Sequence, residues 1–257
     1  MPIVCAHALT GLVGIIRDWT RLPAIGFFLL CLAACGSGPP PIVVHDEPSR
    51  GVWIQFDPRA SGEGHSHPAA ISPTQMATVL RGVRARGRDI VGGFGLLADK
   101  ESVSAFLPVD IPVLASLFSI ALSKASPKDI VTFYLVRNDM TRGRLITSGG
   151  LCVRDRYLIF ILANAHTSPF SVQYENTSTI DTRDQPLLPI ARFKFTAEFS
   201  PPDVRIPNTA TPSGARYEGY LDDSKLLTLD LSRLPAGGED KPNSRREQPS
   251  SGLIVTR

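Results

Sequence analysis

Three consecutive runs rich in β-branched and aromatic residues constrain the fold of this chain more than any other feature. They cover residues 130–136, 144–153 and 157–163. Such side chains suit the pleated, half-buried surface of a sheet. Only Arg154-Asp155-Arg156 separates the second run from the third. We therefore expect these two runs to form a β-hairpin.

The most regular strand pattern lies between Ala191 and Phe199. Apolar and polar side chains alternate there, which is the two-residue period of a strand with one face toward water. Two shorter apolar runs, 216–221 and 226–231, lie on either side of Asp222-Asp223-Ser224. This spacing predicts a further pair of strands.

The segment Ser72-Pro73-Thr74-Gln75 predicts the start of a helix. Ser72 suits the N-cap, Pro73 suits the first helical position, and Gln75 completes a capping box. The apolar residues that follow share one helical face: Met76, Val79, Leu80 and Val83. Four arginines are expected on the flank and C-terminal end of the same helix, where positive charge complements the helix dipole: Arg81, Arg84, Arg86 and Arg88.

A second helix is predicted to begin at Asp110, which serves as its cap, and to end before Ser126-Pro127. Its apolar residues form one wide stripe: Val113, Leu114, Leu117, Phe118, Ala121 and Leu122. The expected fold class is α+β, an antiparallel-rich sheet with about two helices packed on one face. We assign this fold to a single domain, residues 51–234. Residues 235–257 offer almost nothing to bury, so we expect a disordered tail.

The N-terminal region has a different character. Arg17 and Arg21 precede an uncharged apolar stretch, 22–34, which ends in Leu32-Ala33-Ala34 before Cys35. A bilayer-spanning helix needs about 20 apolar residues, so this stretch is more typical of the apolar region of a signal peptide. The residues Leu32-Ala33-Ala34-Cys35 resemble the lipobox of bacterial lipoproteins.

This resemblance implies that residues 1–34 are a signal peptide cleaved between Ala34 and Cys35, and that Cys35 carries a covalent lipid. Several acyl chains together hold a protein on a membrane almost permanently. Gly36 and Ser37 after the cysteine imply the periplasmic face of the outer membrane. Residues 35–50, which include three consecutive prolines, are then the lipidated N-terminus and a flexible stalk. A retained signal anchor is the alternative.

The charge balance argues against a nucleic-acid partner. Loss of Arg17, Arg21 and Asp18 with the leader takes the formal charge from +3 to +2, which is far from the basic character of nucleic-acid-binding domains. The one local excess is the arginine group between positions 81 and 88. It suits contact with anionic lipid or another polyanion, but a solvated helix end is the preferred interpretation.

Cleavage would leave Cys152 as the one cysteine besides the lipidated Cys35. Its place in the apolar run Leu151-Cys152-Val153 predicts a small core residue. A nucleophilic cysteine needs a nearby base, for which His166 is the candidate in sequence.

Common catalytic and phosphate-binding motifs are missing from the sequence, so we predict no catalytic residue and no cofactor apart from the covalent lipid. Two glycine-rich segments, Gly92-Gly93-Phe94-Gly95 and Ser148-Gly149-Gly150, are predicted to be a bulge or close backbone approach rather than phosphate loops.

One cluster contains candidate metal ligands: His65-Ser66-His67, near Asp57 and Glu63. Two imidazoles separated by one residue can point to the same side of an extended segment and share a metal ion. A solvated loop before the Ser72 cap is the competing interpretation.

These observations lead to one principal hypothesis and one alternative. The principal hypothesis is a non-enzymatic, lipid-anchored envelope protein that binds or scaffolds another envelope protein or a wall component. The alternative is an envelope enzyme or metal-binding protein that uses the His65-Ser66-His67 loop. A fold that buries these histidines together with acids would favour the alternative.

Overall fold

The structure is a computed structural model that describes residues 39–60, 64–87, 102–168, 183–190, 195–207 and 223–234. The chain divides into two units, residues 1–40 and 41–257. The description below concerns the second unit. The expected tail at 235–257, the Gly92–Gly95 segment and the 216–221 run lie outside the described residues.

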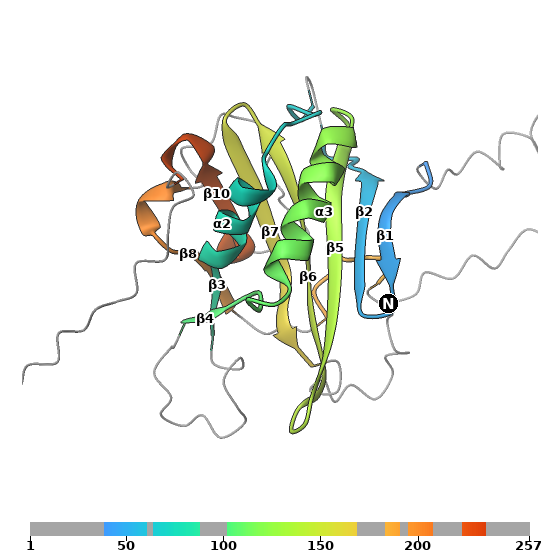
Figure 1. The fold of residues 1–257 in the computed structure, drawn as a ribbon, viewed down its shortest axis with the longest axis vertical. Helices are drawn as coiled ribbons and strands as arrows, with labels where there is room; N and C mark the ends of the chain where they lie inside the picture. The colour runs from blue at the N-terminus through green and yellow to red at the C-terminus, as the bar shows by residue number, and fades with distance from the viewer. Residues whose placement is uncertain are drawn as a thin grey trace, which may run out of the picture. The chain divides into compact units, whose positions relative to one another are not determined.

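A seven-stranded sheet forms the centre of the fold (Figure 1). Every strand pairs antiparallel with its neighbours. In spatial order the strands are β1 (Ile42–Glu47), β2 (Arg50–Phe56), β5 (Asp129–Asp139), β6 (Gly143–Arg154), β7 (Tyr157–Thr167), β10 (Leu226–Asp230) and β9 (Arg205–Ile206). The predicted hairpin is confirmed as β6 and β7, with a turn at Asp155 and Arg156.

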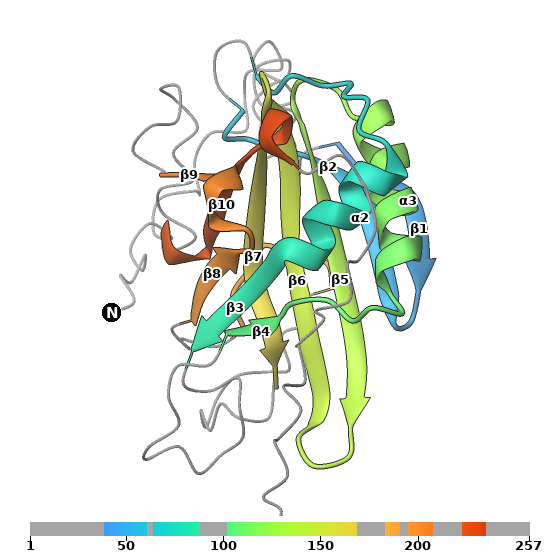
Figure 2. The ribbon, with the colours of Figure 1, turned by 60° about the vertical axis from the view of Figure 1, so that its left-hand side comes forward.

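A second, three-stranded sheet has the order β4 (Ser102–Ser104), β3 (Val83–Gly87) and β8 (Phe195–Phe199). Figure 2 shows β3 continuing from the end of the first helix. The alternation predicted for 191–199 is confirmed along β8, where Phe195, Ala197 and Phe199 are buried. Short 3-10 helices complete the described elements: η3 (Pro202–Val204), η5 (Asp223–Lys225) and η6 (Leu231–Arg233).

Two helices, α2 (Pro73–Gly82) and α3 (Ile111–Lys124), pack side by side on one face of the large sheet (Figures 1 and 2). The predicted capping box at the start of α2 is present, because Ser72 Oγ accepts from Gln75 N and Gln75 Oε1 accepts from Ser72 N. Both helices and the antiparallel sheet therefore confirm the expected α+β class.

Aromatic rings fill the space between the helices and the sheet. Phe133 contacts Phe106, Phe118 and Phe160, with ring centroids 5.3 to 5.7 Å apart. All four rings are essentially inaccessible to solvent. Burying a phenylalanine side chain contributes roughly 1.5–3 kcal/mol, so this cluster is a main source of the attraction between the two layers.

The opposite face of the sheet carries segment 183–190. Ser148 Oγ donates to Pro186 O at 2.7 Å, Asn164 Nδ2 donates to Leu188 O at 2.9 Å, and Ile190 N donates to Asn164 Oδ1 at 2.9 Å. Buried polar groups need such partners, and here they hold the segment against the strands. As predicted, Cys152 is a core residue, in an apolar cluster under this segment.

The sequence interpretation was wrong about the stalk. Residues 42–47 form β1 and pair with β2, so part of the expected stalk at 35–50 belongs to the sheet. The physical reason is local, because Ile42, Val43 and Val44 form a β-branched run that outweighs the preceding prolines.

The sequence interpretation was also wrong about the arginines. Helix α2 stops at Gly82, where an added Cβ would lie 2.5 Å from the Phe199 ring, and Val83 is already extended. Arg84 and Arg86 therefore lie on β3 rather than on the helix. Strand pairing of 83–87 with β8 and β4 overrides the helical pattern.

The start and the apolar stripe of α3 also differ in detail from expectation. Asp110 occupies the N-cap position but its side chain makes no capping hydrogen bond. It pairs instead with Arg50 across the fold, at 2.8 Å. Val113, expected in the apolar stripe, is 42% exposed, whereas Leu114 and Phe118 face the core.

Gly149 offers a direct test of the sheet geometry. The register of β6 against β7 shifts on both sides of Ser148, which confirms the predicted bulge, and a Cβ on Gly149 would lie 2.0 Å from Ile161 O. We expect Gly149→Ala to lower the free energy of unfolding by roughly 1–3 kcal/mol through overpacking, measured by urea denaturation. Gly150→Ala is the comparison and should cost less, because its nearest contact is the flexible end of Leu187 at 2.9 Å and the nearest backbone atom, Val131 O, is 3.1 Å away rather than 2.0 Å. Equal losses in the two variants would contradict this account.

Candidate functional site

The structure separates the arginines that sequence grouped together. Arg88 lies outside the described residues, as does Cys35. Arg81 is exposed at the end of α2. Arg84 Nε donates to Ser102 Oγ at 3.1 Å, and Arg86 Nε pairs with Glu198 Oε1 at 2.9 Å. Two of the four arginines are thus engaged within the small sheet.

The His65-Ser66-His67 segment is not a solvated loop. It lies beside the end of β6, where Ser66 N donates to Val153 O at 2.7 Å and Asp155 N donates to Ser66 Oγ at 2.8 Å. His65 N donates to Pro127 O at 2.7 Å. The pairing of β5 with β6 ends at Val131 and Leu151. The histidine segment therefore takes the place of β5 as the neighbour of the last residues of β6.

His65 forms a buried ion pair with Asp57. Its Nε2 lies 3.1 Å from Asp57 Oδ2, and both side chains are almost completely buried. Asp57 Oδ1 also accepts from Arg59 N and Nε, at 3.0 and 3.2 Å. Burial alone lowers the pKa of His65, but the hydrogen bond to Asp57 and the contact with Cys152 outweigh it and raise this pKa to about 9. His65 is therefore an imidazolium at neutral pH.

His67 has the opposite charge state. Burial and the positive charge of His65 lower the pKa of His67 to about 4. Its Nε2 accepts from Val153 N at 3.0 Å, which requires a neutral ring nitrogen. The two rings lie 5.5 Å apart, centroid to centroid. One charged and one neutral histidine thus share a small buried volume.

The imidazole ring beside Cys152 is that of His65 rather than that of His166. A hydrogen bond with Cys152 is among the contacts that raise the pKa of His65. His166 Nε2 instead donates to Ser104 O at 2.9 Å. Burial, together with the charges of Arg137 and Arg142, lowers the pKa of His166. Cys152 is therefore not paired with His166, in keeping with its prediction as a core residue.

The resulting set, Cys152, His65 and Asp57, contains the residue types of a thiol nucleophile, a base and an orienting carboxylate. Asp57 also lines a cavity of about 350 Å³ together with Arg59, Ile130, Leu187 and neighbouring residues. Cys152 itself has no exposed surface. Within the described ranges, no three histidine, cysteine, aspartate or glutamate side chains are arranged to hold a metal ion.

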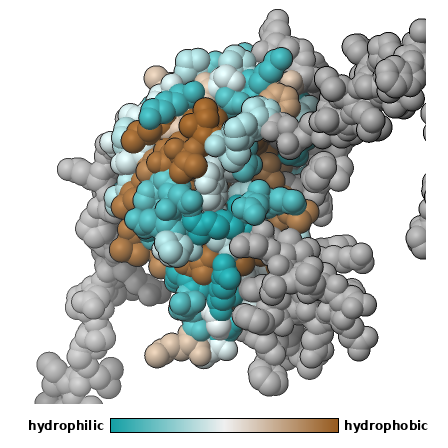
Figure 3. Space-filling view, turned by 90° about the vertical axis from the view of Figure 1, so that its right-hand side faces the viewer, coloured by the Kyte–Doolittle hydropathy of each residue, from teal (hydrophilic) through white to brown (hydrophobic). Residues whose placement is uncertain are grey.

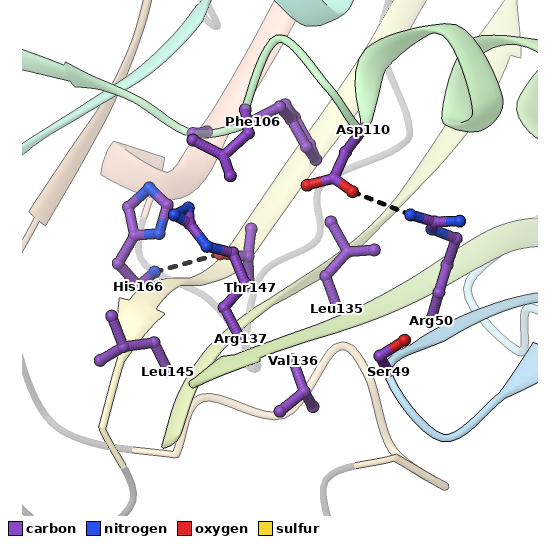
Figure 4. Close-up of a pocket in the computed structure, with 12 residues that line it drawn as sticks. Ser49, Arg50, Phe106, Asp110, Leu135, Val136, Arg137, Leu145, Thr147 and His166 are labelled. Atoms are coloured by element: carbon purple, nitrogen blue, oxygen red, sulfur yellow. Dashed lines mark hydrogen bonds and ion pairs between the residues drawn. The ribbon is translucent and has the colours of Figure 1, made fainter. Parts of the chain in front are cut away.

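A second, smaller cavity lies beneath the start of α3 (Figure 4). It has a volume of about 60 Å³ and contains the Arg50–Asp110 ion pair. The Arg137 and His166 side chains lie next to each other on its other side. No sequence pattern indicates this grouping, because its charged residues come from segments far apart in the chain.

Comparison with protein-family models, with curated proteins and with solved structures found no match to this chain. Neither described helix is long and apolar enough to cross a membrane. What the chain does must therefore be argued from its own residues.

The two histidines predict a stability maximum near pH 6.5. The pKa of His65 is raised from 6.5 to about 9, so its contribution is complete below pH 6.5 and is lost as pH rises toward 9. The pKa of His67 is lowered to about 4, so its contribution is complete above pH 6.5 and is lost as pH falls toward 4. Each contribution is on the order of 3 kcal/mol. Urea denaturation between pH 4 and 9 measures both.

Single substitutions separate the loss of stability at alkaline pH from the loss at acidic pH. We expect His65→Gln to remove the alkaline loss and His67→Gln to remove most of the acidic loss. His45→Gln, on the edge strand β1, controls for loss of an imidazole elsewhere. A stability profile that stays flat between pH 6.5 and 9 in the unsubstituted protein would contradict the buried ion pair.

Proposed function

We propose that this chain is a lipid-anchored envelope protein that acts as a non-enzymatic binding or scaffolding module. The observation that carries the proposal is the short distance in sequence between Leu32-Ala33-Ala34-Cys35 and the first strand. The first residue of β1, Ile42, follows Cys35 by only seven positions. An anchor on Cys35 would therefore act on a rigid sheet rather than through a long linker.

The length of this connection limits how far the domain can lie from the lipid. Seven Cα steps span at most about 25 Å even when fully extended. The end of the domain that contains Ile42 would then remain within reach of the lipid head groups. With Gly36 and Ser37 after the cysteine, the periplasmic face of the outer membrane is the proposed location.

The same end of the domain exposes apolar side chains. Ile42 pairs with Ile54, and Phe56 pairs with Asp129, which follows the C-terminus of α3 by five residues. Ile42, Phe56 and Ile120 are each more than 40% exposed. Figure 3 looks onto the side that carries β1 and shows brown patches among teal ones.

Two cations accompany these apolar residues. Lys124 ends α3, and Lys128 follows it in the turn before β5. Both are exposed. Apolar side chains flanked by lysines suit the interface of a membrane that contains anionic lipid. We therefore propose that the lipid surface contacts this end of the domain, while the remaining faces are available to an envelope protein or wall component.

Mass spectrometry of the mature N-terminus tests the anchor. We expect the mature chain to begin at Cys35 with a diacylglyceryl group and an acylated amino group. We expect Cys35→Ser to abolish this mass and to release the protein from the membrane fraction. An intact leader on the unsubstituted protein, or an unmodified Cys35, would contradict the proposal.

A photo-reactive amino acid at a single position tests the membrane contact. In the lipidated protein, a photo-crosslinker in place of Ile120 should form lipid adducts. The matched control replaces Met140, a fully exposed residue in the turn between β5 and β6, at the other end of β5 from Asp129. Adducts to protein alone at position 120, or equal lipid adducts at both positions, would overturn the assignment of this surface to lipid.

The alternative function, an enzyme or metal-binding protein built on the His65 loop, gains support from the burial of His65 and His67 with Asp57 and Cys152. Zinc titration by calorimetry distinguishes its metal-binding form. The proposed binding module predicts no specific heat of zinc binding. Heat that disappears in both His65→Ala and His67→Ala would favour the alternative.

A further inference from the structure

The cavity beneath α3 is formed by four parts of the fold. Ser49 precedes β2 and Arg50 begins it, Arg137 comes from β5 and His166 from β7, while residues 105–107 and Asp110 cover them (Figure 4). Its volume of about 60 Å³ equals roughly two water molecules at their liquid volume. This space suits one small polar group rather than a whole organic ligand.

The charged residues around this cavity are unequal in number. Arg50 and Arg137 contribute two positive charges, and Asp110 is the one acid among the lining residues. Asp110 Oδ1 accepts from Arg50 Nη2 at 2.8 Å, while Arg50 Nε is buried and makes no hydrogen bond. One cationic charge is therefore left over at the cavity.

Arg137 carries this excess charge. Its guanidinium has no ion pair with any residue in the part of the chain that the structure describes. Its charge nevertheless acts on the neighbouring His166, where it helps to lower the pKa. Arg137 is an exposed residue whose guanidinium lies beside the His166 ring (Figure 4), so an anion that enters the cavity can reach it from solvent.

His166 lines the cavity and has an unusual backbone conformation. His166 has φ of 48°, in the left-handed region that is uncommon for residues other than glycine. Its N donates to Thr147 Oγ1 at 3.2 Å, and its Nε2 donates to Ser104 O. These contacts fix the ring beside Arg137, and strained backbone of this kind is frequent at ligand sites.

We propose that this cavity binds a single oxyanion, the carboxylate or phosphoryl group of a small ligand, through the guanidinium groups of Arg137 and Arg50. A guanidinium matches both groups with two parallel N–H donors. The Arg50–Asp110 pair limits the affinity, because Asp110 repels the anion and occupies one edge of Arg50. This site does not depend on lipid attachment at Cys35.

Isothermal titration of the purified protein with inorganic phosphate and, separately, with acetate tests the proposal. We expect one site per chain for at least one probe, and the tighter probe distinguishes a phosphoryl ligand from a carboxylate ligand. We expect Arg137→Gln to weaken binding at least tenfold. We expect Asp110→Asn, which releases Arg50 and removes the repulsion, to tighten binding at least threefold. Circular dichroism confirms that each variant is folded.

Arg81→Gln is the matched control, because Arg81 is an exposed arginine on α2 that does not line the cavity. It should leave the affinity for both probes unchanged. Absence of binding by both probes would overturn the proposal. Binding that Arg137→Gln leaves intact, or that Arg81→Gln weakens as much, would overturn it as well.

Discussion

The fold depends on the segment His65-Ser66-His67, which bonds to the end of β6 where β5 no longer pairs with it. Pairing between β5 and β6 stops at Leu151, and the polar backbone beyond this residue would be unsatisfied without a substitute. Ser66 N and His67 Nε2 supply the partners of Val153. The ion pair between His65 and Asp57 then fixes the segment from within. A charged group is costly to bury, so this position is stable only while both partners are present.

This constraint determines how the rest of the domain is arranged. Because Asp57 and residues 65–67 are bonded to one end of the large sheet, α2 starts at Ser72 already in position over its face. Helix α3 then packs against α2 and covers the aromatic cluster around Phe133. The two ends of the domain consequently differ in chemistry. The end near Ile42 and Lys128 carries the proposed lipid contact, and the opposite end carries the cavity between Arg50, Arg137 and His166.

Local patterns in the sequence were sufficient for much of the fold. The capping box at Ser72, the hairpin of β6 and β7 and the alternation along β8 each depend on residues close in sequence. The errors arose where distant contacts decide the outcome. Arg84 and Arg86 continue a helical pattern, yet β8 and β4 draw them into a sheet. Asp110 is a residue type that often caps helices, but its carboxylate accepts a hydrogen bond from Arg50, 60 residues away.

The candidate site was predictable only in part. His65, His67 and Asp57 attract attention as ligand-type residues near one another in sequence. Their burial, and the contact of His65 with Cys152, come from the insertion beside β6 and have no local signal. The contact of His166, the candidate base for Cys152, with Ser104 likewise joins distant segments and has no local signal. No sequence pattern marks Arg137 as a site residue, because an arginine near the end of a strand is ordinarily solvated.

The charge state of His65 is the most direct test of this account. Long-range ¹H–¹⁵N correlation spectra of the imidazoles report protonation at each ring nitrogen as pH is varied. The buried ion pair predicts that His65 remains doubly protonated at pH 7.5 and titrates near pH 9, while His67 is neutral throughout that range. A His65 ring that titrates near pH 6.5, or that is neutral at pH 7.5, would contradict the interaction on which the fold depends.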